Sequence, residues 1–117
     1  MESAKHTELR YLYRDGCNNK AHGATRFRGS FTPEDEAKLR AHLDGIQFIP
    51  GQVGLADLQQ SLGNGRWAVD IDHPWHEFLE LAHVDHAPEC AQEFQAFLPG
   101  FLSTAWDEAG ALQALAS

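Results

Sequence analysis

The sequence predicts an α+β domain in which a small antiparallel sheet, made of an N-terminal hairpin and a later strand, packs against two or three helices. Three observations predict this class: an aromatic-rich stretch with period-two alternation, a second extended stretch after a polar turn, and later segments with helical apolar spacing. A chain of 117 residues has the size of a single domain. We expect one core within residues 5–108 and a frayed tail at 109–117.

The hairpin is predicted from TELRYLYRDG and ATRFRGSF. In the first stretch Leu9, Tyr11 and Tyr13 alternate with other residues, which is typical of a strand with one buried face. GCNNK lies between the two stretches and supplies residues that tolerate the left-handed backbone of a reversal. The expected strands cover residues 8–14 and 23–29.

Two helices are predicted to cover one face of the sheet. FTPEDEAKLRAHLDG predicts a helix over 32–44, which Thr32 caps and Gly45 ends. PECAQEFQAFL predicts a second helix over 88–98, with Pro88 in its first turn.

A third strand is expected over residues 77–84. FLELAHV fits a strand or a continued helix, because its periodicity does not separate the two, and we favour the strand. The predicted core then consists of Tyr11, Tyr13, Phe27, Leu39, Leu43, Phe78 or Leu79, Phe94 and Phe97.

Charge is distributed unevenly along the chain. The net charge is −8, yet residues 67–117 hold nine acids and no lysine or arginine. Phosphate contacts need such bases, so we expect no direct binding of nucleic acid. A polar start, two distant cysteines and the lack of a long apolar run favour a cytoplasmic protein without a membrane span.

Four segments, YLYRDGCNNK, FTPEDEAKLR, FIPGQVGLADLQ and DHPWHEFLEL, together resemble a group of small uncharacterised bacterial proteins. The resemblance spans roughly residues 9–85 and departs at Asn19, where an aromatic residue is frequent in that group. It implies that the hairpin turn and the HPWHE segment are structural hallmarks. It implies no activity, cofactor or catalytic residue.

Residues 70–86 hold four histidines and three aspartates, which suggests a metal site. A metal needs three or four donors that converge on one point. His73 and His76 are three residues apart, and so are His83 and His86. Pro74 interrupts a helix between the first two. In a strand, residues three apart point to opposite faces. We therefore expect no metal and no cofactor. If a metal were bound, the first candidates would be His73, His76 and Asp72, followed by His83 and His86.

The basic residues gather in the hairpin, where Arg10, Arg14, Arg26 and Arg28 lie among aromatic residues. Such interleaving can bind single-stranded nucleic acid. We favour the alternative, in which the aromatic rings face the core while the arginines face solvent or pair with acids of a neighbouring strand. The acids expected to pair in this way are Glu77 and Glu80.

Two classes of function remain. The first is a non-enzymatic acidic protein-binding module, a regulator or inhibitor such as a nucleic-acid mimic of the anti-restriction or anti-CRISPR type. Its partner would be a protein with a basic surface, and the sequence leaves the oligomeric state open. The alternative is a small metal- or histidine-dependent hydrolase that uses the His73–His86 cluster. We assign no catalytic residue, and the expected partner-binding residues are Asp70, Asp72, Glu77, Glu80, Asp85, Glu89 and Glu93.

The histidine cluster generates the first testable prediction. Protein purified without a His tag should contain less than stoichiometric zinc, manganese and nickel, because neither periodicity gathers the four imidazoles. Elemental analysis checks this directly. One equivalent of metal that is lost in the His73→Ala and His76→Ala variants would contradict it.

Overall fold

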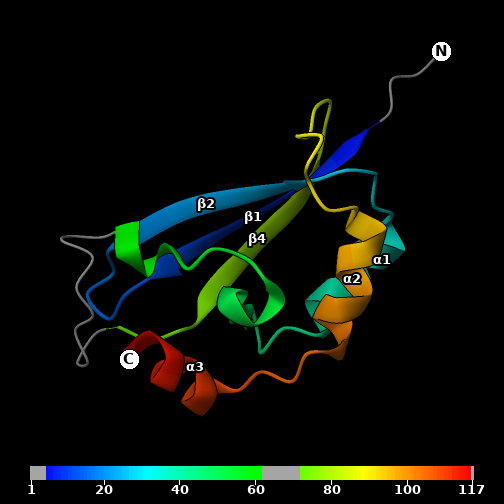
Figure 1. The fold of residues 1–117 in the computed structure, drawn as a ribbon. Helices are drawn as coiled ribbons and strands as arrows, with labels where there is room; N and C mark the ends of the chain where they lie inside the picture. Colours follow the sequence, from blue (N-terminus) through cyan, green and yellow to red (C-terminus); the bar gives the residue numbers. More distant parts are fainter. Residues whose placement is uncertain (1–4, 62–71, 117) are drawn as a thin grey trace.

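The computed structural model describes residues 5–61 and 72–116, and Figure 1 shows their arrangement. Strands dominate the N-terminal part, and two of the three α-helices in these described ranges follow the last strand. The elements in chain order are β1 (His6–Arg14), β2 (Lys20–Phe27), α1 (Pro33–Ala41), β3 (Gln47–Phe48), the 3₁₀ turns η1 (Pro50–Val53) and η2 (Leu58–Ser61), β4 (His76–Val84), α2 (Phe94–Ser103) and α3 (Glu108–Ala116).

The sheet has the strand order β2-β1-β4-β3, and all its neighbouring strands are antiparallel. β1 lies between its hairpin partner β2 and the later strand β4, so the predicted α+β class and antiparallel sheet are confirmed. The two-residue strand β3, which the sequence analysis did not predict, pairs with the start of β4.

The hairpin turn is built around the carboxylate of Asp15. Its Oδ1 accepts hydrogen bonds from the backbone N–H groups of Cys17 and Asn19, at 2.8 and 2.9 Å. The side-chain amide of Asn19 donates to Oδ2 at 3.0 Å. Asn18 adopts a φ of 66°, a left-handed conformation that asparagine tolerates better than most residues. The GCNNK segment is thus explained by the geometry of a reversal.

A β-bulge in β4 decides which side chains enter the core. Arg10 pairs with Glu80 while its neighbour Tyr11 pairs with Phe78, so Leu79 is the extra residue. The bulge lets Phe78 and Leu81 both face inward although they are three residues apart, and Leu79 is 40% exposed. The core therefore contains Phe78 and excludes Leu79.

The helices pack against the inner face of the sheet, and the outer face carries charged side chains of β1 and β2. A capping box starts α1, where Thr32 accepts from the N–H of Asp35 and the Asp35 carboxylate accepts from the N–H of Thr32. The helical side chains Leu39, Phe94, Phe97, Leu98 and Phe101 form one buried cluster with Leu9, Tyr11, Phe27, Phe48, Leu55, Phe78 and Leu81.

The predicted bounds of the second helix, 88–98, are wrong. α2 begins at Phe94, because the backbone of Arg28 pairs with Gln92 and Phe94 and holds the preceding residues in a bridge to the end of β2. α3 covers most of the tail at 109–117, and Ala111 within it is only 6% exposed because it packs inward; fraying of this tail stays a prediction. Within the described residues, no helix combines the length and the apolar character that crossing a membrane requires.

The contact between Gly23 and η2 generates the second prediction. A Cβ at Gly23 would lie 2.6 Å from Cδ2 of Leu58, so Gly23→Ala should lower the free energy of unfolding by about 1–3 kcal/mol. Urea denaturation measures the change. Adding Leu58→Ala should give less loss than the sum of the single substitutions, because the clash disappears.

A matched control is Gly100→Ala, the same substitution in α2 at a position where a Cβ meets nothing within 4 Å. It should raise stability by about 0.5–1 kcal/mol, since alanine favours the helix over glycine. Equal effects at both glycines would contradict the proposed contact between Gly23 and Leu58.

Candidate functional site

His73 fastens the start of the HPWHE segment to the end of β1. Its Nε2 lies 2.7 Å from the carbonyl oxygen of Arg14, which can only accept, so this nitrogen carries the proton. Its Nδ1 accepts from the backbone N–H of Trp75 at 3.1 Å. These partners assign a neutral imidazole in which both nitrogens bind the backbone.

His76 is fully buried and engages the backbone in the same manner. Its Nε2 accepts from the N–H of Leu58 at 3.0 Å, and its Nδ1 lies 3.1 Å from the carbonyl oxygen of Pro74. The proton must therefore be on Nδ1. Oδ1 of Asp57 lies 3.4 Å from Nε2, beside a ring nitrogen that already accepts a hydrogen bond.

Tyr13 packs against both imidazoles, with ring centroids 5.2 Å from His73 and 5.0 Å from His76. Its hydroxyl donates to Oδ1 of Asp72 at 2.5 Å and accepts from the N–H of His73. The Gln59 amide donates to the other oxygen of Asp72. Burial and the Asp72 carboxylate together raise the pKa of the Tyr13 hydroxyl. This cluster clamps the end of β1, η2 and the start of β4.

The other two histidines of the segment lie elsewhere. His83 is exposed and stacks on Phe31, with centroids 4.2 Å apart and the planes 11° from parallel. His86 is exposed in the loop after β4, and its carbonyl oxygen accepts from Arg26. Among the described residues no three potential metal ligands converge. The structure thus does not bring His73, His76, His83 and His86 together as one site.

The outer face of the sheet carries an array of ion pairs. Glu8 binds two arginines, Arg10 at 2.6 Å and Arg26 at 2.7 Å. The hydrogen bonds from Arg10 and Arg26 hold the pKa of the Glu8 carboxyl below its ordinary value. Glu77 and Glu80 pair with hairpin arginines, which was one of the expected alternatives: Arg10 lies 3.2 Å from Glu80, and Arg14 lies 2.7 Å from Glu77.

These contacts divide the seven acids predicted to bind a partner. Asp72 belongs to the Tyr13 cluster, and Glu77 and Glu80 face the arginines of the hairpin. Asp85 and Glu89 are exposed and form no ion pair within the structure as described. The remaining two are Glu93, which lies 3.7 Å from Arg28, and Asp70, which lies outside the described residues.

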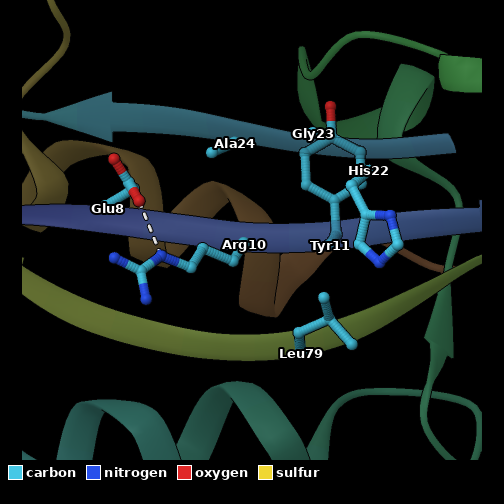
Figure 2. Close-up of a pocket in the computed structure, with 7 residues that line it drawn as sticks. All are labelled: Glu8, Arg10, Tyr11, His22, Gly23, Ala24 and Leu79. Carbon is cyan, nitrogen blue, oxygen red and sulfur yellow. Dashed lines mark hydrogen bonds and ion pairs between the residues drawn. The ribbon is translucent and has the colours of Figure 1, made fainter.

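A shallow depression of about 380 Å³ opens on the outer face, and Figure 2 shows the residues that line it. Ala24 of β2 leaves space there because its side chain is small, and Leu79 at the bulge contributes an apolar wall. Arg10 and His22 lie on either side, but the guanidinium of Arg10 is already hydrogen-bonded to Glu8. The depression therefore offers a surface rather than a set of free catalytic groups.

Sequence reasoning missed Glu8 and Asp57. Glu8 falls on the outer face by strand alternation, so period-two counting could have found it. Asp57 gave no signal, because only the fold brings it beside His76, 19 positions later. Comparisons of the chain with protein-family models, curated proteins and solved structures gave no match.

The buried imidazole generates the third prediction. His76→Leu should lower the free energy of unfolding by about 2 kcal/mol or more, because the N–H of Leu58 and the carbonyl of Pro74 lose their partner. Thermal and urea denaturation check this.

The matched control is His86→Ala, an exposed position where only the backbone carbonyl is used. The free energy of unfolding of this variant should differ from that of the parent chain by less than about 0.5 kcal/mol. A His76→Leu variant as stable as this control would contradict a structural role for the buried ring.

Proposed function

We propose that this protein is a non-enzymatic protein-binding module that meets a basic partner through the acidic loop between β4 and α2. The acidic loop is defined as residues 85–93, and its carboxylates are Asp85, Glu89 and Glu93. The observation that carries the proposal is that these acids project from an anchored loop without strong internal pairing. Of the seven acids predicted to bind a partner, the proposed surface keeps these three.

Four hydrogen bonds support the view that the loop is presented in a fixed shape. The backbone N–H of Arg28 donates to Gln92, and its carbonyl accepts from Phe94, at 3.0 and 2.8 Å. The side chain of Arg28 donates to the carbonyl of Ala91, and that of Arg26 donates to the carbonyl of His86. A loop ordered before binding loses less conformational entropy when a partner docks.

Charge supports a basic partner. Between residues 67 and 117 no lysine or arginine balances the acids in sequence, and the hairpin arginines mainly neutralise Glu8, Glu77 and Glu80. A surplus of negative charge on the loop speeds encounter with a positive surface and makes the encounter sensitive to salt. The ring nitrogens of both histidines of the HPWHE segment are hydrogen-bonded to the backbone. This favours a protein-binding function over histidine-based hydrolysis.

The fourth prediction tests the acidic loop. Reversing two charges in Asp85→Lys/Glu89→Lys should reduce recovery of the partner in a low-salt pull-down several-fold, because the attractive field is lost. Quantitative mass spectrometry of the captured proteins measures recovery. Raising the salt to about 0.5 M should weaken capture by the parent chain, since screening shortens the range of the field.

The control variant Glu34→Lys/Asp44→Lys makes the same change in net charge at exposed acids outside the loop. It should retain the partner. Equal losses in both variants would show that only net charge matters, and capture of no partner by the parent chain would refute the proposal.

A further inference from the structure

A small cavity of about 180 Å³ lies between η1, the HPWHE segment and α3. Its walls are mainly apolar and include Ile49, Pro74 and Ala111, and among the described residues the one charged side chain that lines it is Asp57. In Figure 1 α3 lies at the bottom of the molecule and the acidic loop near the top, so the cavity is separate from the proposed docking loop.

The walls of the cavity are held in place by hydrogen bonds at the start of α3. The amide of Gln52 donates to the carbonyl of Asp107 at 2.8 Å and accepts from its N–H at 3.0 Å. The indole N–H of Trp75 donates to the carboxylate of Glu108. Both contacts tie α3 to the segments opposite it, so the cavity is formed before any ligand enters.

Within the part of the chain that the structure describes, no lysine or arginine pairs with Asp57. Its side chain is 18% exposed, and Oδ1 accepts from the N–H of Gln59 at 2.9 Å. His76 lies beside it, but the Leu58 amide hydrogen occupies the place where a proton on Nε2 would lie. Oδ2 accepts no hydrogen bond from any residue that the structure describes. Oδ2 keeps contact with solvent, since no buried side-chain oxygen of the described residues lacks a partner. A largely buried carboxylate is usually paired with a cation.

We propose that this cavity binds a primary alkylammonium group, with the ammonium at Asp57 and the alkyl chain against Ile49, Pro74 and Ala111. The volume is below the range of about 300–1,000 Å³ typical of drug-sized ligands, so it suits a short chain. Mainly apolar walls with a single carboxylate match a cation that carries an apolar tail. The same chemistry occurs in free small amines and in lysine side chains.

The fifth prediction uses n-butylamine, which is protonated at neutral pH, as the probe. Titration of the ¹⁵N-labelled full chain should give saturable amide shifts at Gly51, Gly110 and Ala111, which line the cavity. n-Butanol has the same shape without the charge and should bind at least about tenfold more weakly. Equal responses to both probes, or no saturation with butylamine, would overturn the proposal.

Two variants separate charge from volume. Asp57→Asn removes the charge with little change in shape, and Ala111→Leu fills the space while keeping the carboxylate; each should abolish the saturable shifts. Glu34→Gln removes an exposed carboxylate on α1 and should leave them unchanged. Unchanged binding by a folded Asp57→Asn variant, with its spectrum otherwise preserved, would overturn the proposal even if Ala111→Leu fails to fold.

A capped Ala-Lys-Ala peptide distinguishes the two sources of the amine. Shifts at the same three amides would support a lysine side chain of a partner as the occupant. Binding of butylamine without binding of the peptide would support a free small amine.

Discussion

The central position of β1 in the sheet is the constraint on which the rest of the structure depends. One edge of β1 pairs with β2 and the other with β4, which lies some 70 residues further along the chain. The inner side chains Leu9, Tyr11 and Tyr13 are buried. On the opposite face of β1, Glu8 and Arg10 form the outer ion pairs. One strand therefore organises the core, the charged face and the clamp on the HPWHE segment.

The hydrogen bonds of His73 and His76 to the backbone give the histidines of HPWHE a structural explanation. An imidazole can donate with one nitrogen and accept with the other, so it can join two backbone groups that no helix or sheet satisfies. His73 does this at the end of β1, and His76 does it between η2 and the start of β4. Two of the four histidines that resemble a metal site thus serve backbone groups in irregular segments that need partners.

The sequence predicted those features that depend on local patterns. Alternation located the hairpin and its pairing arginines, and capping residues located α1. The bulge at Leu79 could not be predicted, because residues 78 and 81 are three apart and such spacing suits a helix equally well. The start of α2, the position of α3 and the site at Asp57 depend on contacts between segments distant in sequence, which periodicity does not report.

The position of β2 at the edge of the sheet affects how the protein behaves at high concentration. It pairs with β1 on one edge and with no strand on the other within the described residues, so one row of backbone groups could receive a second chain. If two copies joined antiparallel with Gly23 opposite Gly23, Lys20 of each would stand opposite Arg26 of the other, because residues on one face of an antiparallel pair oppose each other. Like charges at both ends of the strand thus oppose growth of the sheet into an aggregate.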